Sequence, residues 1–338
     1  EEMSKALPSS VAGDTHYASL WARQGLERQL ALLEVAFLLY YGRLSPSAAF
    51  LADILECGHR TQFGQRQANA SLFDTDAHAK CRCIRDLLLF LAIECLNLEA
   101  ALDVVPEGIA APDDAALAPL ATDPDALERC LVQLEKAASD VAYAPLLLSF
   151  ALVLRRLDEV GSHTPLEPRL AATLDVVDHG PQIWRRLLQG AFDPSMQLFD
   201  TLHSLVTSPL LRTATRALGA SNLSALAYRA VFKGLLLTIT ELVQPEYLPD
   251  LDPLVDLWCL TFRAMPGDVP DGIAALCTQF WTQDIQYPTR ASLLDTVRRR
   301  FPASFLPLIR LAHALSGTTP AAPSPETVTA MMNALAPV

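Results

Sequence analysis

The chain has 338 residues, of which 51% are hydrophobic and 19% charged, with 14 glycines and a formal net charge of −12. A chain this apolar is long enough to bury a large core and is not intrinsically disordered, and so few glycines argue against a β-sandwich rich in turns. The negative charge argues against sequence-independent binding of nucleic acid, which needs lysine and arginine to neutralise phosphates. Seven cysteines, an odd number scattered along the chain, are not a disulfide framework and indicate a reducing compartment.

The first residues are mostly polar and carry no pattern of a secretory signal. The most hydrophobic window runs from Leu87 to Val105 and is interrupted by Glu94, Glu99 and Asp103. Each of these carboxylates would cost about 2.5–3.5 kcal/mol at the centre of a bilayer. We therefore predict a soluble helix here and no transmembrane segment.

Six positions where serine or aspartate directly precedes proline are predicted helix starts. The side-chain oxygen can accept a hydrogen bond from an amide of the first turn, and proline suits the first helical position because it lacks a donor there. The pairs are Ser45-Pro46, Asp123-Pro124, Asp193-Pro194, Ser208-Pro209, Asp252-Pro253 and Ser324-Pro325. After the last pair, apolar residues follow at i, i+3, i+4 and i+7, which predicts one helix face made of Val328, Met331, Met332 and Leu335.

Hydrophobic residues recur at helical spacing along the chain, and no strand-like alternation is present. In chain order, the predicted stripes are Leu26, Leu30, Leu33, Phe37 and Tyr40; Ile84, Leu87, Leu88, Leu91, Cys95 and Leu98; Leu127, Cys130, Leu131 and Leu134; Leu146, Phe150, Val153 and Leu157; Leu198, Leu202 and Leu205, then Leu211, Ala214 and Leu218; Val231, Leu235, Ile239 and Leu242; and Phe305, Leu308, Ile309, Ala312 and Leu315. The charged residues between them, such as Arg156, Arg229 and Lys233, are expected on the opposite, solvated faces.

These patterns predict an all-α fold, specifically an irregular α-solenoid of HEAT-like or armadillo-like stacked helix pairs. We expect residues 1–338 to form a single continuous solenoid segment with roughly a dozen to fifteen helices joined by short loops. The predicted starts are unevenly spaced, so no regular repeat is visible, and stacked pairs tolerate such drift. A compact all-α bundle is the alternative. Long loops are expected near residues 58–70 and 103–122.

Metal ligation is the first chemistry to weigh, and its best candidates are His78, Cys81 and Cys83. Two cysteines at i and i+2 on a helix point to different faces, and zinc would need a further ligand from elsewhere. The simpler interpretation places Cys81 and Cys95 on the apolar stripe as buried thiols. We predict no metal site and no cofactor.

Acid–base candidates are equally sparse, and each has a structural interpretation. Two adjacent aspartates are interpreted as carboxylates that complement the dipole at a helix start, and a cluster of two aspartates and a histidine as a cap at a helix end. Two further histidines have no serine or cysteine in a recognisable catalytic arrangement. These residues are Asp113 and Asp114; Asp175, Asp178 and His179; and His163 and His203. No catalytic residue is assigned, and the chain is not expected to be an enzyme.

The run Arg298-Arg299-Arg300 is the strongest local charge feature. We place it in the last turn of a helix that begins near Thr289, where cations complement the helix dipole; a phosphate or nucleic-acid contact is the alternative. Four aromatic residues are candidate partner anchors, although a core position suits each of them better. They are Tyr247, Trp258, Phe262 and Trp281.

Three segments of the C-terminal third carry a family resemblance. They are LAYRAVFKGLLLTITELVQPEYLPDLDPLVDLWCLTF from Leu226 to Phe262, the Gln279-Phe280-Trp281 phrase, and LLDT followed by RRRFPASFLPLIRLAHAL, which end at Leu315. They are similar to the N-terminal region of the large inner-ring scaffold nucleoporins, the nucleoporin-188 class and its nucleoporin-192/205 sisters, and slightly more to the former. These are apolar packing motifs and not catalytic signatures.

The resemblance implies a fragment from the N-terminal part of a much longer solenoid in the inner ring of the nuclear pore complex, at the nuclear envelope. Implied partners are other nucleoporins, especially short linear segments of linker nucleoporins, with transport factors as a further class and no direct nucleic acid. No residue here matches a known binding pocket, so partner-binding residues stay unassigned. A soluble transport-receptor-like or other peptide-binding α-solenoid is the alternative, and an all-α enzyme is the third reading.

Overall fold

The computed structural model describes residues 3, 5, 7–10, 13–103, 123–136, 140–161, 182–211, 222–248, 250–263, 270–287, 289–317, 328–329 and 331–332. Over these residues all regular secondary structure is helical, which confirms the predicted all-α class. Contacts divide the chain into two compact units, unit 1 (Glu1–Leu198) and unit 2 (Phe199–Val338).

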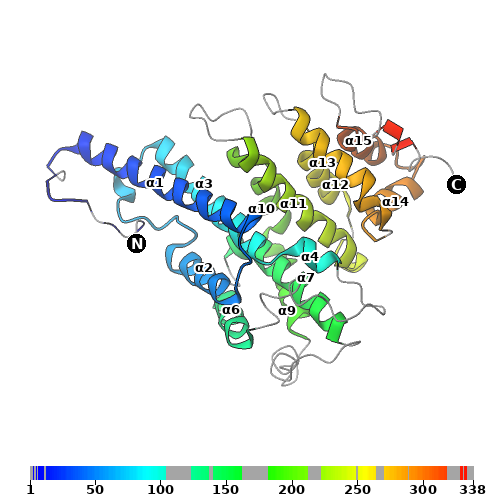
Figure 1. Cartoon of the computed structure of the whole chain (residues 1–338), viewed down its shortest axis with the longest axis horizontal. Helices are drawn as coiled ribbons and strands as arrows, with labels where there is room; N and C mark the ends of the chain where they lie inside the picture. The colour runs from blue at the N-terminus through cyan, green and yellow to red at the C-terminus, as the bar shows by residue number, and fades with distance from the viewer. Residues whose placement is uncertain are drawn as a thin grey trace. The chain divides into compact units, whose positions relative to one another are not determined.

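Unit 1 is built around two helices that each contain a largely apolar segment buried on all sides. Its elements are α1 (Thr15–Gly42), α2 (Ala48–Thr61), η2 (Ala70–Leu72), α3 (Thr75–Cys95), α4 (Leu98–Asp103), α6 (Pro124–Lys136), η3 (Val141–Tyr143), α7 (Ala144–Gly161), α9 (Ile183–Ala191) and η4 (Pro194–Met196) (Figure 1). Residues 86–93 of α3 and 144–154 of α7 are all buried. Helix α3 contacts α1, α2 and α7, and α7 also contacts α4 and α9. A helix that is hydrophobic all round is stable only when neighbours surround it, as they do here.

Unit 2 is organised around α11 in the same way. Its elements are α10 (Leu198–Val206), which starts at the last residue of unit 1, η5 (Pro209–Leu211), α11 (Asn222–Leu242), η6 (Pro245–Tyr247), α12 (Asp252–Phe262), α13 (Pro270–Thr282), η7 (Asp284–Gln286), α14 (Ser292–Arg299) and α15 (Leu306–Leu315). Helix α11 contacts η5, α12, α13 and α14, while α15 packs on α12 and α14 (Figure 1).

An aromatic cluster fills the core between α12 and α13. The Trp258 and Phe262 rings stack with centroids 5.3 Å apart, and Phe280 meets Trp258 edge-on at 5.4 Å. The Trp281 indole donates a hydrogen bond of 2.8 Å to the carbonyl of Leu315, which ties α13 to the end of α15. Trp258, Phe262 and Trp281 are at most 2% exposed, so their predicted core position is confirmed.

Of the predicted helix caps, Asp123 is confirmed most directly, because its Oδ1 accepts a 3.0 Å hydrogen bond from the Ala126 amide at the start of α6. Asp193 also caps, but it starts the short turn η4. The prediction for Ser45 was wrong: the N-cap of α2 is Ser47, two residues later, and its hydroxyl accepts from the Phe50 amide.

The remaining Ser/Asp–Pro pairs had mixed outcomes. Ser208 directly precedes the short turn η5, whose first residue is Pro209. Asp252 lies inside the first turn of α12 and does not cap it; instead the Asp250 carboxylate accepts a hydrogen bond from the Asp252 amide. Ser324-Pro325 lies outside the described residues, although Val328, Met331 and Met332 beyond it are helical. Several nearby polar residues could cap each helix, and the Ser/Asp–Pro pattern alone does not identify which of them does.

The predicted loop near residues 58–70 is shorter and better anchored than expected. Helix α2 continues to Thr61, and left-handed residues Gln62, Phe63 and Gly64 then reverse the chain. The Phe63 side chain is fully buried against Tyr143, with ring centroids 4.6 Å apart. A Cβ on Gly58 would lie 2.9 Å from the Phe63 ring, so the close approach requires glycine there. From residue 104 onwards, the loop predicted at 103–122 lies outside the described residues.

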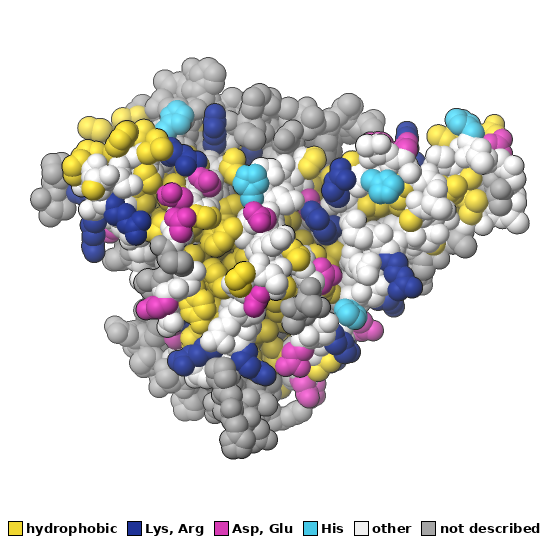
Figure 2. Space-filling view, turned by 180° about the vertical axis from the view of Figure 1, so that it is seen from behind, with side chains coloured by type: hydrophobic (Ala, Val, Ile, Leu, Met, Phe, Trp, Pro, Cys, Tyr) yellow, Lys and Arg dark blue, Asp and Glu magenta, His cyan; other side chains and the backbone are white. Residues whose placement is uncertain are grey.

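The apolar stripes predicted for α3, α6, α7 and α11 are buried, whereas only Leu315 of the stripe predicted for α15 is buried. Phe305 and Ile309 are 55% and 54% exposed, and the buried face of α15 is made of Leu311, Ala314 and Leu315. The helix is apolar on more than one face, and its contacts with α12 and α14 select which one is covered. Figure 2 shows hydrophobic side chains at the surface near the left edge of the view, over this part of unit 2.

Three cations predicted on solvated faces are buried instead. Arg229 is 1% exposed and donates hydrogen bonds to the carbonyls of Leu211 and Thr261, at 3.3 and 2.8 Å. Arg156 donates to the carbonyl of Ala101 at 3.0 Å, near the end of α4. Lys233 is also 1% exposed. The prediction was wrong because helices that are surrounded have no solvated face. Arg229 and Arg156 bind carbonyls at the ends of neighbouring elements, where the helix dipole favours positive charge, and Lys233 binds the buried carboxylate of Asp284.

Candidate protein-binding surface

The 28-residue helix α1 is apolar on two faces but covered on only one. Its inner face packs on α3 and η2 and buries Ala18, Ala22, Leu26 and Phe37. The opposite face carries five large apolar side chains that are 44–62% exposed, namely Tyr17, Leu20, Leu32, Val35 and Leu39. At 3.6 residues per turn these positions fall within about 120° of one another and span roughly 33 Å of helix. We call this set the α1 outer face.

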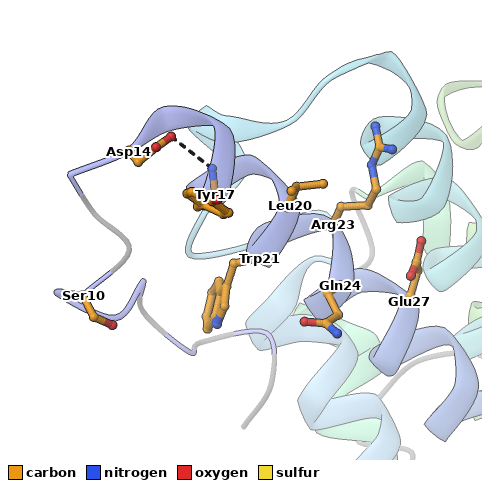
Figure 3. A pocket seen from close by; sticks show the side chains of 8 residues that line it. All are labelled: Ser10, Asp14, Tyr17, Leu20, Trp21, Arg23, Gln24 and Glu27. Atoms are coloured by element: carbon orange, nitrogen blue, oxygen red, sulfur yellow. Dashed lines mark hydrogen bonds between the residues drawn. The ribbon is translucent and has the colours of Figure 1, made fainter.

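A pocket of about 520 Å³ lies at the N-terminal end of the α1 outer face. It is lined by Ser10, Asp14, Tyr17, Leu20, Trp21, Arg23, Gln24 and Glu27. Figure 3 shows the Trp21 ring extending from α1 into the space beside the segment that carries Ser10. The helix starts here because Asp14 caps it, its Oδ1 accepting from the amides of His16 and Tyr17 at 2.8 and 3.3 Å.

Ion pairs to α3 hold the polar side of this pocket. The Arg23 guanidinium lies 2.6 Å from Asp74, the N-cap of α3, and the Lys80 ammonium lies 2.7 Å from Glu27. The Ala77 amide and the Arg23 guanidinium both donate to Asp74 and lower the pKa of that carboxyl. Such exposed pairs add little stability, but they orient α1 on α3 and so keep the aromatic side of the pocket turned outwards.

A buried pair of amides locks the same helix from beneath. Gln29 and Gln67 are 6% and 9% exposed and exchange two hydrogen bonds of 3.1 and 2.9 Å, while Gln67 also donates to the Gly64 carbonyl. Satisfied buried amides specify one packing arrangement, because any shift of α1 would leave them unpaired. The α1 outer face is therefore presented by a rigid element.

One carboxyl in unit 1 has a strongly shifted pKa. Burial raises the pKa of Glu94 on α3 to about 7, and the nearby charge of Glu99 adds to the increase. Burial, with help from both carboxyls, also raises the pKa of the Tyr41 hydroxyl. None of these residues lines the pocket at α1, so the cluster affects the pH dependence of stability and does not identify a reaction centre.

The residues weighed as metal ligands, His78, Cys81 and Cys83, do not converge in the structure. Cys81 is buried, and burial raises its thiol pKa to about 11, while Cys83 is half-buried. The exposed His78 uses its Nδ1 to bond the carbonyl of Asp74 at 2.8 Å. Within the described ranges no three His, Cys, Asp or Glu side chains are placed to share a metal ion, and none of the seven cysteines forms a disulfide.

Unit 2 contains a buried ionic cluster that joins three elements. The Lys233 ammonium on α11 lies 3.1 Å from Asp284 in η7, and the Arg290 guanidinium before α14 lies 3.5 Å from the same carboxyl and 3.6 Å from Glu241. Arg290 also stacks over the Tyr287 ring at 4.1 Å. With opposite charges balanced and the side chains of all four residues at most 10% exposed, the cluster orients helices and is closed to a ligand.

Other residues singled out in the sequence are not brought together. Asp113, Asp114, His163, Asp175, Asp178 and His179 lie outside the described residues. His203 is exposed on α10, and Tyr247 is half-buried in η6. The sequence analysis missed the α1 outer face, although a second row of apolar residues beside the predicted stripe of α1 was a visible signal.

Among the described residues, no helix is both long enough and apolar enough to span a bilayer. Neither protein-family models nor curated proteins match the chain.

Proposed function

We propose that this chain is part of a structural scaffold of the nuclear pore complex inner ring, an α-solenoid that holds other nucleoporins at fixed positions. The α1 outer face carries the proposal: large exposed apolar patches mark protein interaction sites, and this one is long and rigidly mounted. The assembly named in the proposal, the inner ring, comes from the resemblance of residues 226–262, 279–281 and 293–315 to inner-ring scaffold nucleoporins. The proposal includes no catalytic role.

The solenoid part of the proposal rests on helices that pack in pairs. The pairs with the most extensive contacts are α1 with α3, α2 with α6 and α7 with α9 in unit 1, and α12 with α15 in unit 2; other helices separate the two partners along the chain in the α1–α3, α2–α6 and α12–α15 pairs. Stacked pairs leave lateral helix faces open, which suits binding of extended or helical segments.

The α1 outer face has the spacing of a surface that binds a short amphipathic helix. Its two apolar clusters, Tyr17 with Leu20 and Leu32 with Val35 and Leu39, lie on either side of the polar residues Gln24 and Arg28. A partner segment would place apolar anchors at i, i+3, i+4 and i+7 on these clusters, and the polar interval would set its register. Unit 1 contains 27 acidic and 16 basic residues, so a neutral or basic segment suits it best.

Recovery after photobleaching of the tagged full-length protein in living cells tests the assembly. A nuclear-rim signal that fails to exchange over many minutes is the expected result. Recovery within seconds would instead favour a peptide-binding transport receptor, and a diffuse, freely mobile pool would overturn the assignment to the pore.

The α1 outer face is tested with the double variant Leu32→Ser and Val35→Ser. Each of these side chains is more than half exposed, so folding should be nearly unaffected, whereas a partner that buries both should bind at least tenfold more weakly. The matched control is Leu44→Ser with Val132→Ser, which removes a leucine and a valine that are 48% and 41% exposed and lie outside the α1 outer face. Rim retention that survives the first variant and fails in the second would contradict the role of α1.

A further inference from the structure

A second exposed apolar surface lies where α14 meets α15. Phe301, Phe305, Leu306 and Ile309 are each 54–57% exposed, and the first of them directly follows Arg298, Arg299 and Arg300 at the end of α14. We call these seven residues the α14–α15 corner. Figure 2 shows hydrophobic and basic side chains side by side over this part of unit 2.

The corner projects outwards and is held in place. All residues from 301 to 306 are exposed, and such an uninterrupted run marks a convex edge and not the floor of a groove. Backbone hydrogen bonds fix its shape: the Ser304 amide donates to the Arg300 carbonyl at 2.8 Å, and the Ile309 amide donates to that of Phe305 at 3.1 Å. The apolar side chains are therefore displayed by an ordered turn.

The sequence that forms the corner is basic although the chain as a whole is acidic. Residues 296–325 contain four arginines and no aspartate or glutamate. Arg310 is paired with Asp256, but neither Arg299 nor Arg300, both exposed, forms an ion pair with any residue that the structure describes. Unit 2 holds 11 acidic and 10 basic residues, so it lacks the acidic excess of unit 1 that would repel a negative surface.

We propose that the α14–α15 corner binds the surface of an anionic membrane. Phenylalanine, leucine and isoleucine on a convex turn can enter the boundary between headgroups and acyl chains, which deforms around them and needs no preformed groove. The neighbouring arginines then lie at the level of the lipid phosphates, and each basic residue near an anionic surface adds to the attraction. A rigid protein partner would need a matching concave pocket, whereas a bilayer would not. The contact is peripheral and does not span the membrane.

Co-flotation with vesicles tests this inference on the whole 338-residue chain. Vesicles of 70% phosphatidylcholine and 30% phosphatidylserine should bind the protein, vesicles of pure phosphatidylcholine should bind it far less, and added salt should weaken the binding. Arg299→Gln with Arg300→Gln should reduce partitioning by about 30-fold, since two basic side chains are lost. Phe305→Ser with Ile309→Ser should reduce it by at least tenfold.

The variant Leu32→Ser with Val35→Ser is the matched control, because it removes equally exposed side chains from α1 and should leave vesicle binding unchanged. Circular dichroism of each variant checks folding. Failure to bind the anionic vesicles, or equal loss in the α1 and corner variants, would overturn the inference. A corner variant that loses a protein partner while no vesicle is bound would assign the corner to that protein and would overturn it too. Vesicle binding needs no nucleoporin, so its result is independent of the proposed scaffold role.

Discussion

Glu94→Gln should stabilise unit 1 at pH 8 and have little effect at pH 4.5. Burial and Glu99 raise the pKa of Glu94 from its ordinary value of 4.5 to about 7. Between these pH values the unfolded chain releases a proton that the folded chain retains, so the free energy of unfolding falls as pH rises. Each unit of pKa corresponds to about 1.4 kcal/mol, which makes the full loss about 3 kcal/mol; because Glu94 is half-buried and water screens its charge, we expect about 2 kcal/mol.

Urea unfolding of wild type and variant, followed by circular dichroism at several pH values from 4.5 to 8, measures this difference. Glutamine resembles the protonated acid in shape and cannot ionise, so the variant should lack the decline that Glu94 causes in the wild type. Glu56→Gln, on the exposed side of α2, controls for the loss of a carboxylate. A stability difference between Glu94→Gln and wild type that is the same at pH 4.5 and at pH 8 would refute the reasoning.

Two further predictions concern stability and are checked by the same urea titrations at pH 7. Asp284→Asn should lower the free energy of unfolding by about 3–5 kcal/mol, because Lys233 and Arg290 would lose the buried carboxylate between them; a loss below about 1 kcal/mol would contradict this role. Asp123→Ala should cost about 1 kcal/mol through loss of the N-cap of α6, whereas Ser45→Ala, at a pair that does not cap, should cost almost nothing. Equal effects of these two alanine substitutions would contradict the assignment of caps.

The exposed surfaces show where local patterns mislead. On α1 the predicted stripe includes Leu26 and Phe37, which are buried, but the row with Leu32 and Val35 is nearly as apolar and stays exposed. On α15 the predicted stripe contains Ile309, which is exposed. When a helix is apolar on more than one side, its sequence does not state which side a neighbour covers, and an interaction surface of this kind is visible only after packing is known.

The all-α class, most helix positions and the capping role of Asp123 follow from the amino-acid pattern, because caps and intrahelical hydrogen bonds join residues only three or four positions apart. Only the tertiary structure shows that the cations predicted on solvated faces are buried and what they bind, since Lys233 binds Asp284, which lies 51 positions away in the sequence, and Arg156 binds the carbonyl of Ala101, which lies 55 positions away. The tertiary structure likewise determines that the α1 outer face and the α14–α15 corner are exposed to solvent. Helical periodicity records which residues share a side of a helix, whereas burial depends on what distant parts of the chain bring against that side.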